Sequence, residues 1–118
     1  MATFNVSVLT DEISQDLGHA LEVASKEFGF GYVDLREAGK KNIMKWDSKD
    51  VAEARRLLER YQLRVACIAS PIFKVDWPGA PRSKYSPQRD EFSADFTYEQ
   101  QDEMLKHQRT ILELLEKK

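Results

Sequence analysis

Cysteine is nearly absent from this chain, because Cys67 is the one thiol among 118 residues. A lone cysteine forms no disulfide within the chain, so we expect a reducing, cytoplasmic compartment rather than a secreted protein. The N-terminus, MATFNVSVLTDE, lacks a basic region followed by an apolar run, and we expect no signal peptide. No stretch approaches the ~18 consecutive apolar residues of a membrane helix, so we expect no membrane partner.

Histidine is also scarce, and the net charge of the chain is small. A formal net charge of −2 gives no electrostatic reason to expect nucleic acid as a partner. His19 and His107 fall on expected helices without converging ligands, which predicts surface residues rather than metal ligands. Cys67 lies in an apolar run without a His/Asp arrangement, which predicts a small core residue rather than a nucleophile.

What the chain does contain is a strand-then-helix pattern that occurs three times. Apolar residues make up 42% and charged residues 32% of the chain, which is typical of a globular α/β protein with one domain over residues 1–118. Alternating or continuous apolar residues predict three strands, which are FNVSVLT (4–10), YVDLRE (32–37) and RVACIAS (64–70). The three strand-and-helix units span residues 4–28, 32–61 and 64–118.

A helix with an apolar stripe at 3.6-residue spacing is expected after each strand. The stripes are Leu17, Ala20, Leu21, Ala24 and Phe28, then Val51, Ala54, Leu57, Leu58 and Tyr61, then Met104, Gln108, Ile111, Leu112 and Leu115. The expected N-terminal caps are Ser14 or Asp16, Asp47 or Ser48, and a capping box formed by Thr97 and Gln100. Gly29 is the expected left-handed cap at the end of the first helix. TDEISQ (10–15) is predicted to form a polar turn, and residues 38–46 a loop.

Right-handed crossovers would place the three strands parallel and in sequential order. The continuous apolar third strand suits a parallel strand that is covered on both faces. Both a parallel β/α barrel and a doubly wound sheet fit this local pattern.

Four strings resemble a known family when they are taken in order, namely LTDEIS (9–14), YVDLRE (32–37), GKKNI (39–43) and CIASPIFK (67–74). Together they resemble the sugar phosphate isomerase/epimerase family, in the xylose isomerase-like superfamily of TIM barrels. The likeness runs from the first strand to the third helix and would correspond to a bit less than half of a family member. It implies the N-terminal part of a TIM (β/α)8 barrel, whose chemistry lies at the carboxyl ends of the strands.

The resemblance also implies a divalent metal (Mn, Mg, Co or Zn) and proton transfer next to a carbonyl, in aldose–ketose isomerisation or ketose epimerisation. It places the metal ligands on the fourth and later strands, so we assign no metal ligand and no catalytic residue to this chain. What it implies here is a lining for a sugar or sugar phosphate substrate at the first three strand ends. That lining consists of Asp11, Glu12, Arg36, Glu37, Ser70 and Lys74.

These charged side chains also have purely structural interpretations. Asp11 and Glu12 could equally form a solvated turn that favours the N-terminus of the following helix. Arg36 and Glu37 are adjacent at the end of a strand, so only one of them can face a barrel axis. Their alternative role is a structural ion pair.

The segment 71–96 contains all four prolines, which exclude regular structure through most of it. It follows a strand and carries aromatic residues, so we predict a loop that covers the substrate in the complete enzyme.

Three units cannot close a barrel, because a complete (β/α)8 barrel needs about 200–250 residues. We therefore expect a barrel portion that is inactive as an isolated chain, with a non-catalytic α/β module or an assembly subunit as the alternative. The first and third strands would each leave an open parallel edge. Such edges favour self-association or dependence on further sequence.

Overall fold

The computed structural model describes residues 3–72, 81, 83–84 and 97–116. Its main sheet has three parallel strands whose order across the sheet, β1–β2–β5, follows their order in the chain. The strands are β1 (Ser7–Leu9), β2 (Tyr32–Leu35) and β5 (Arg64–Ile68). The predicted mixed α/β fold with parallel, sequential strands is therefore confirmed, and the described residues form no closed barrel.

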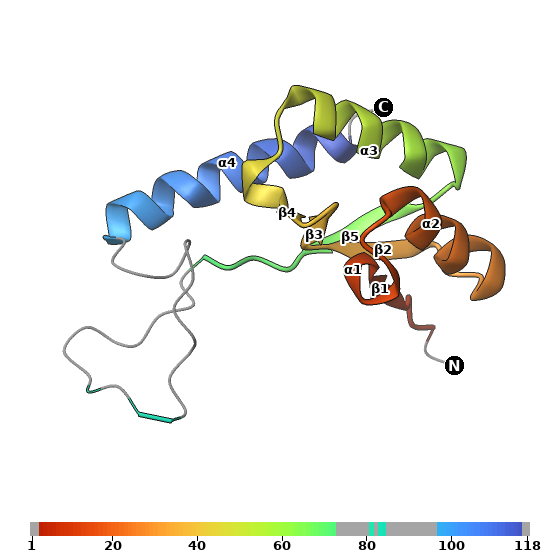
Figure 1. Cartoon of the computed structure of the whole chain (residues 1–118), viewed down its shortest axis with the longest axis horizontal. Coiled ribbons are helices and arrows are strands. Elements are labelled where there is room, and N and C mark those ends of the chain that lie inside the picture. Colours follow the sequence, from red (N-terminus) through yellow and green to blue (C-terminus); the bar gives the residue numbers. More distant parts are fainter. Residues whose placement is uncertain (1–2, 73–80, 82, 85–96, 117–118) are drawn as a thin grey trace.

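Helices α2, α3 and α4 lie on the same side of this sheet (Figure 1). The helices of the described residues are α1 (Thr10–Ile13), α2 (Leu17–Glu22), α3 (Ser48–Arg60) and α4 (Tyr98–Glu116). A π-helical turn, Val23–Glu27, continues α2. α4 packs against both α3 and β5, so it returns the chain toward the sheet as a crossover helix does.

A small antiparallel hairpin and a 3-10 turn occupy the segment predicted to be a loop. The hairpin pairs β3 (Glu37–Ala38) with β4 (Lys41–Asn42), and the 3-10 turn covers Ile43–Lys45. Ile43 and Trp46 are buried in the main core, which the sequence analysis did not anticipate. This segment therefore contributes to the core.

The core lies between the helices and one face of the sheet. Strand residues Val33, Leu35, Val65 and Ile68 pack there against helix residues that belong to the predicted stripes. Those helix residues are Leu21, Ala24, Val51, Ala54, Leu58, Ile111 and Leu115. Phe28 is an exception, since its side chain is 58% exposed after the π-helical turn shifts the helical periodicity.

The predicted helix caps are confirmed. The Asp16 carboxylate accepts a hydrogen bond from the backbone N–H of His19, and Asp47 forms a capping box with Asp50. Thr97 and Gln100 exchange the two hydrogen bonds of a capping box, at 2.9 and 3.2 Å. Gly29 has a φ of +68°, as a left-handed C-terminal cap requires.

Strand β1 is shorter than predicted, and the polar turn after it is helical. Ser7 pairs with Tyr32, the first residue of β2, so Phe4 and Val6 extend beyond the sheet and are exposed. TDEI (10–13) forms the single helical turn α1, with buried Thr10. Short local segments of this kind are decided by tertiary contacts rather than by propensity.

Strand β5 is covered on one face, which corrects the prediction of burial on both. Ala66 and Cys67 are exposed, so Cys67 is not a core residue. The reason is that helices α2, α3 and α4 cover the opposite face of the sheet. An apolar run alone does not reveal on how many faces a strand is covered.

The structure also bears on the predicted histidines, membrane helices and substrate-covering loop. His19 and His107 are exposed, as predicted for surface histidines. None of the helices in the described ranges is both long and apolar enough to cross a membrane. The predicted substrate-covering loop lies largely outside the described residues, since 73–80, 82 and 85–96 do not belong to them.

Candidate functional site

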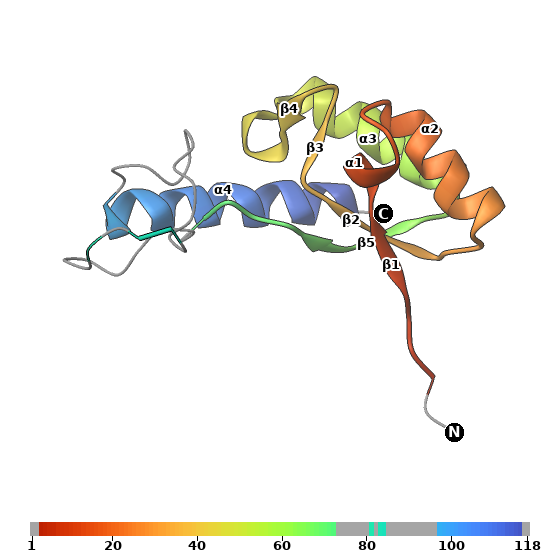
Figure 2. The same ribbon diagram turned by 60° about the horizontal axis from the view of Figure 1, so that its bottom comes forward.

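The candidate site lies where the three parallel strands end, because parallel strands bring their carboxyl ends to one edge of the sheet. Asp11 follows β1 and Arg36 directly follows β2. The Ala69 N–H donates to the Leu35 carbonyl at 2.8 Å, which holds the end of β5 beside the end of β2. Figure 2 shows β1, β2 and β5 side by side in a view turned by 60° from that of Figure 1.

Asp11 and Arg36 form an ion pair across this edge. The Arg36 guanidinium donates to Asp11 Oδ2 through Nε at 3.0 Å and through Nη2 at 2.6 Å. The Asp11 side chain is 4% exposed, whereas that of Arg36 is 44% exposed. The solvated-turn interpretation of Asp11 is therefore wrong, and Arg36 makes an ion pair while half of its side chain still meets solvent.

The carboxylates around Arg36 raise the pKa of its guanidinium group. Its hydrogen bonds to Asp11 raise the pKa of Arg36 above the ordinary value, and the charges of Glu12 and Glu37 act in the same direction. Arg36 is thus a permanent cation in an acidic surrounding.

Two buried polar atoms at this edge have no hydrogen-bond partner within the described residues. They are Thr10 Oγ1 and Asp11 Oδ1, one residue apart in α1. Leaving a buried polar atom without a partner costs about 1–3 kcal/mol, so such atoms are uncommon and often belong to functional sites. The carboxyl edge of β1 therefore holds hydrogen-bonding capacity that these protein groups leave unused.

Glu37 and Glu12 lie in different environments. Glu37 belongs to β3 rather than to the end of β2, and its carboxylate accepts from Gln15 Nε2 at 2.7 Å. Gln15 Oε1 in turn accepts from the Lys40 N–H at 2.8 Å. Glu37 thus helps to hold the hairpin against the turn before α2, while Glu12 is exposed.

Ser70, which follows β5, makes a local hydrogen bond rather than one to Asp11 or Arg36. Ser70 is exposed, and its hydroxyl accepts from the Ile72 N–H at 3.0 Å, which forms a local turn. Lys74 lies outside the described residues. The structure therefore brings Asp11 and Arg36 into direct contact, and it places Glu12, Glu37 and Ser70 around them without such a contact.

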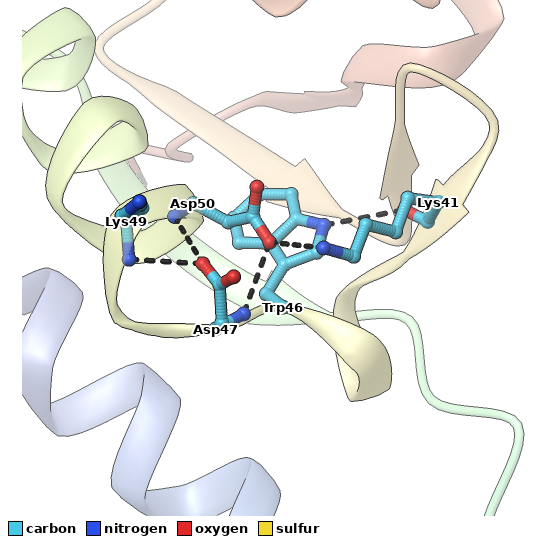
Figure 3. A network of polar contacts seen from close by, with 5 residues as sticks. All are labelled: Lys41, Trp46, Asp47, Lys49 and Asp50. Atoms are coloured by element: carbon cyan, nitrogen blue, oxygen red, sulfur yellow. Dashed lines mark hydrogen bonds and ion pairs between the residues drawn. The ribbon is translucent and has the colours of Figure 1, made fainter.

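A separate polar network fixes the hairpin beside α3 (Figure 3). Asp50 accepts from Lys41 Nζ and from the Asp47 N–H, while Trp46 Nε1 donates to the Lys41 carbonyl at 3.2 Å. The Lys41 ammonium lowers the pKa of Asp50, and the Asp50 carboxylate raises the pKa of Lys41. A cavity of about 300 Å³ adjoins this network. Asp50 and Lys41 form an ion pair with each other, so we interpret the network as structural.

One polar pair that the sequence analysis did not single out lies on the open face of the sheet. Ser7 Oγ donates to Asp34 Oδ1 at 3.0 Å, which joins β1 to the central strand β2. The signal was present in the sequence, because Val33 and Leu35 are apolar and strand side chains alternate between faces. Once these two residues face the helices, Asp34 must face the other side.

The described residues do not fit the divalent metal that the resemblance implies. No group of three His, Cys, Asp or Glu side chains within the described ranges is placed to hold a metal ion. We therefore derive no chemical step through a metal from these residues.

Comparisons with known proteins identify no relative of this chain. No protein-family model matches the chain, and neither does any curated protein or solved structure. The functional argument consequently depends on the geometry of the chain itself.

Proposed function

We propose that this chain is the substrate-side, N-terminal portion of a TIM-barrel sugar or sugar-phosphate isomerase or epimerase. In this proposal the reaction is proton transfer next to a substrate carbonyl, and a divalent metal, if the protein uses one, would be held by residues outside this chain and would supply a Lewis acid. The residues of this chain bind and orient the sugar. The isolated chain is then inactive.

The observation that carries the proposal is a charged residue, Asp34, on the uncovered face of a sheet whose other face is packed by helices. One half of a doubly wound sheet has the same strand order, but its second face is covered by further helices and is therefore apolar. Here Asp34 stands on that second face, near the carboxyl end of the central strand. A charged residue at this place suits the interior end of a barrel, where substrates bind.

The Asp11–Arg36 pair supports a binding role at the same end of the sheet. Asp11 fixes one side of the guanidinium, and the exposed part of Arg36 can donate to a carbonyl or hydroxyl oxygen of the substrate. A pre-oriented cation loses less side-chain freedom on binding than a free one.

The alternative is a non-catalytic α/β module or assembly subunit. It is favoured by the exposure of Ala66 and Cys67 on the open face, since such a face can meet another protein as readily as a substrate. The coding sequence after Lys118 separates the two proposals. Further strand-and-helix units with Glu, Asp or His at strand ends support the enzyme, whereas a stop codon directly after Lys118 contradicts it.

A turnover assay tests the enzyme proposal directly. The protein encoded by the complete reading frame is assayed with Mn²⁺ for interconversion of aldoses and ketoses and for ketose epimerisation, followed by chromatography. We expect Arg36→Gln to lower turnover at least about tenfold, as for the loss of one charged hydrogen bond. Arg56→Gln is the matched control, because Arg56 pairs with Glu53 on the exposed side of α3 and should leave turnover unchanged.

The isolated chain provides the opposite test. Robust metal-dependent turnover by residues 1–118 alone would contradict the assignment of the catalytic residues to later strands.

A further inference from the structure

We infer that the cavity between α3, the start of α2 and the β3–β4 hairpin is a separate binding site, which binds a small organic ammonium ion with an apolar body. The cavity has a volume of about 300 Å³, which suits a small ligand because ligand pockets commonly measure about 300–1,000 Å³. The described residues that line it include none of Asp11, Asp34 and Arg36. This site is therefore distinct from the strand ends and does not depend on the proposed function.

Three segments that are far apart in the sequence form the walls of the cavity, and polar contacts hold them together. The Gly39 N–H donates to the Gln15 carbonyl at 2.7 Å, which holds the hairpin against the turn before α2. The ion pair of Lys41 with Asp50 holds the other side of the hairpin against α3 (Figure 3). The walls are thus fixed without a ligand, and a preformed site loses little conformational freedom on binding.

The cavity has an apolar wall. Leu17, Leu57 and Trp46 line it, and Trp46 is buried. The indole N–H of Trp46 is its one hydrogen-bond donor, and it already donates to the Lys41 carbonyl. The ring therefore offers a ligand apolar contacts, which suit a hydrocarbon or aromatic body.

Gly18 leaves part of the cavity unfilled. It lies within α2, where every residue type except proline is ordinarily more favourable than glycine. A Cβ atom at Gly18 would lie 3.4 Å from Asp16 Oδ1 and 3.6 Å from Leu57 Cδ2, which are ordinary van der Waals distances. The packing of α2 on α3 therefore does not require glycine. Both neighbours line the cavity, so a methyl group at this position would occupy space that a ligand can use.

The charged side chains that line the cavity favour a cation. They are three carboxylates and one ammonium group, those of Asp16, Asp50, Glu53 and Lys41. Lys41 pairs with Asp50, and Glu53 pairs with Arg56. Asp16 makes no ion pair within the described residues, so its charge is the one that a cationic ligand can neutralise.

Asp16 is also placed to accept a hydrogen bond from the ligand. Its Oδ1 accepts from the backbone N–H of His19 at 3.0 Å as the cap of α2, which orients the carboxylate. Its Oδ2 accepts no hydrogen bond from the part of the chain that the structure describes, and the residue is exposed. An ammonium N–H group forms a strong, charge-assisted hydrogen bond to such an oxygen. The ammonium group of the ligand then lies beside Asp16, and its apolar body contacts Trp46 and Leu57.

The test is a titration of the ¹⁵N-labelled 118-residue chain with three probes that share a phenyl ring. They are 2-phenylethylamine as the cation, 2-phenylethanol as the neutral compound and 3-phenylpropionate as the anion. We expect the amine to shift the backbone amides of Gly18 and Gly39 and the indole N–H of Trp46. Its dissociation constant should be at least about tenfold below that of the alcohol, as for one charged hydrogen bond. Equal binding of the alcohol or of the propionate would overturn the inference, as would the absence of shifts with the amine.

Asp16→Asn removes the charge and keeps the helix cap, because asparagine caps helices about as well as aspartate does. It should weaken binding of the amine about tenfold and leave the melting temperature nearly unchanged. Asp102→Asn is the matched control, since Asp102 is an exposed carboxylate of α4 and does not line the cavity. An Asp16→Asn chain that binds the amine as tightly as the unchanged chain would contradict the role of this carboxylate.

Gly18→Ala tests the volume of the cavity without a loss of stability. The added methyl group should weaken binding of the amine about fivefold, as expected when a packed site is overfilled. The melting temperature should stay the same or rise, because alanine favours the helix. Unchanged binding by Gly18→Ala would show that the amine does not occupy this cavity.

A blocked lysine, Nα-acetyl-lysine N-methylamide, distinguishes a small amine from the side chain of a peptide. We expect it to bind more weakly than 2-phenylethylamine, because its linear stem covers less of the apolar wall. Tighter binding of the blocked lysine would overturn the assignment to a small amine.

Discussion

At the scale of single residues, Gln62 illustrates a local strain that the chain tolerates. Its φ is +53°, a left-handed conformation that disfavours residues with a Cβ atom. The position ends α3, where the Leu63 N–H donates to the Leu58 carbonyl at 3.0 Å and the Gln62 N–H donates to the Glu59 carbonyl. This is the hydrogen-bond pattern of a Schellman motif, in which glycine is the favoured residue.

We predict that Gln62→Gly raises the free energy of unfolding by about 1 kcal/mol, because removal of the Cβ strain exceeds the entropy that glycine adds to the unfolded chain. Urea denaturation followed by circular dichroism measures this change. Gln62→Ala keeps the Cβ atom and serves as the control, for which no stabilisation is expected. Equal stability of the glycine and alanine variants would refute the explanation.

Residues whose roles depend on their immediate sequence neighbours were predictable, and those that depend on distant elements were not. Asp16 and Asp47 cap helices through contacts within three residues, so their spacing in the sequence was sufficient. The burial of Cys67 was predicted wrongly, because it depends on whether helices cover both faces of the sheet. The Asp11–Arg36 pair spans 25 positions, and the sequence placed its members at one edge without revealing their contact.

At the scale of secondary-structure elements, α4 closes part of the free edge of β5. The Arg64 N–H donates to the carbonyl of Gly31, the residue before β2, so the next N–H along the strand, that of Val65, points to the opposite edge. There it donates to Glu116 Oε1 at 3.1 Å, and Glu116 Oε2 accepts from Arg64 Nη2 at 3.1 Å. A charged side chain of this kind protects a sheet edge from pairing with another strand.

We predict that Glu116→Ala lowers the free energy of unfolding by about 1 kcal/mol, the usual net value of a hydrogen bond. The Val65 amide should also exchange its hydrogen faster, because it loses its partner. Hydrogen exchange followed by NMR measures both quantities.

Glu113→Ala is the matched control, since Glu113 is an exposed carboxylate on the same helix. Equal exchange of Val65 in the two variants would refute the role of Glu116. This contact joins residues 51 positions apart, and no local sequence signal could have predicted it.

At the scale of the whole molecule, the order of the strands was predictable because short crossovers leave consecutive parallel strands side by side. The one-sided helix cover was not, because the sequence pattern also fitted a sheet covered on both faces. The two edges of the sheet also differ from each other. The β5 edge is partly occupied by Glu116, whereas β1 is preceded by exposed apolar residues.

We therefore expect any self-association of the chain to use the β1 edge. Phe4 is 82% exposed and Val6 is 56% exposed, and burying each in an interface would contribute about 1.5–3 kcal/mol. Sedimentation velocity over a range of concentrations should detect association, and the double substitution Phe4→Ser and Val6→Ser should abolish it. Phe28→Ser is the control, because Phe28 is similarly exposed but follows the π-helical turn after α2. Association that persists in the double variant, or that Phe28→Ser abolishes, would place the contact elsewhere, and a chain that stays monomeric at every concentration would contradict the expectation of open-edge assembly.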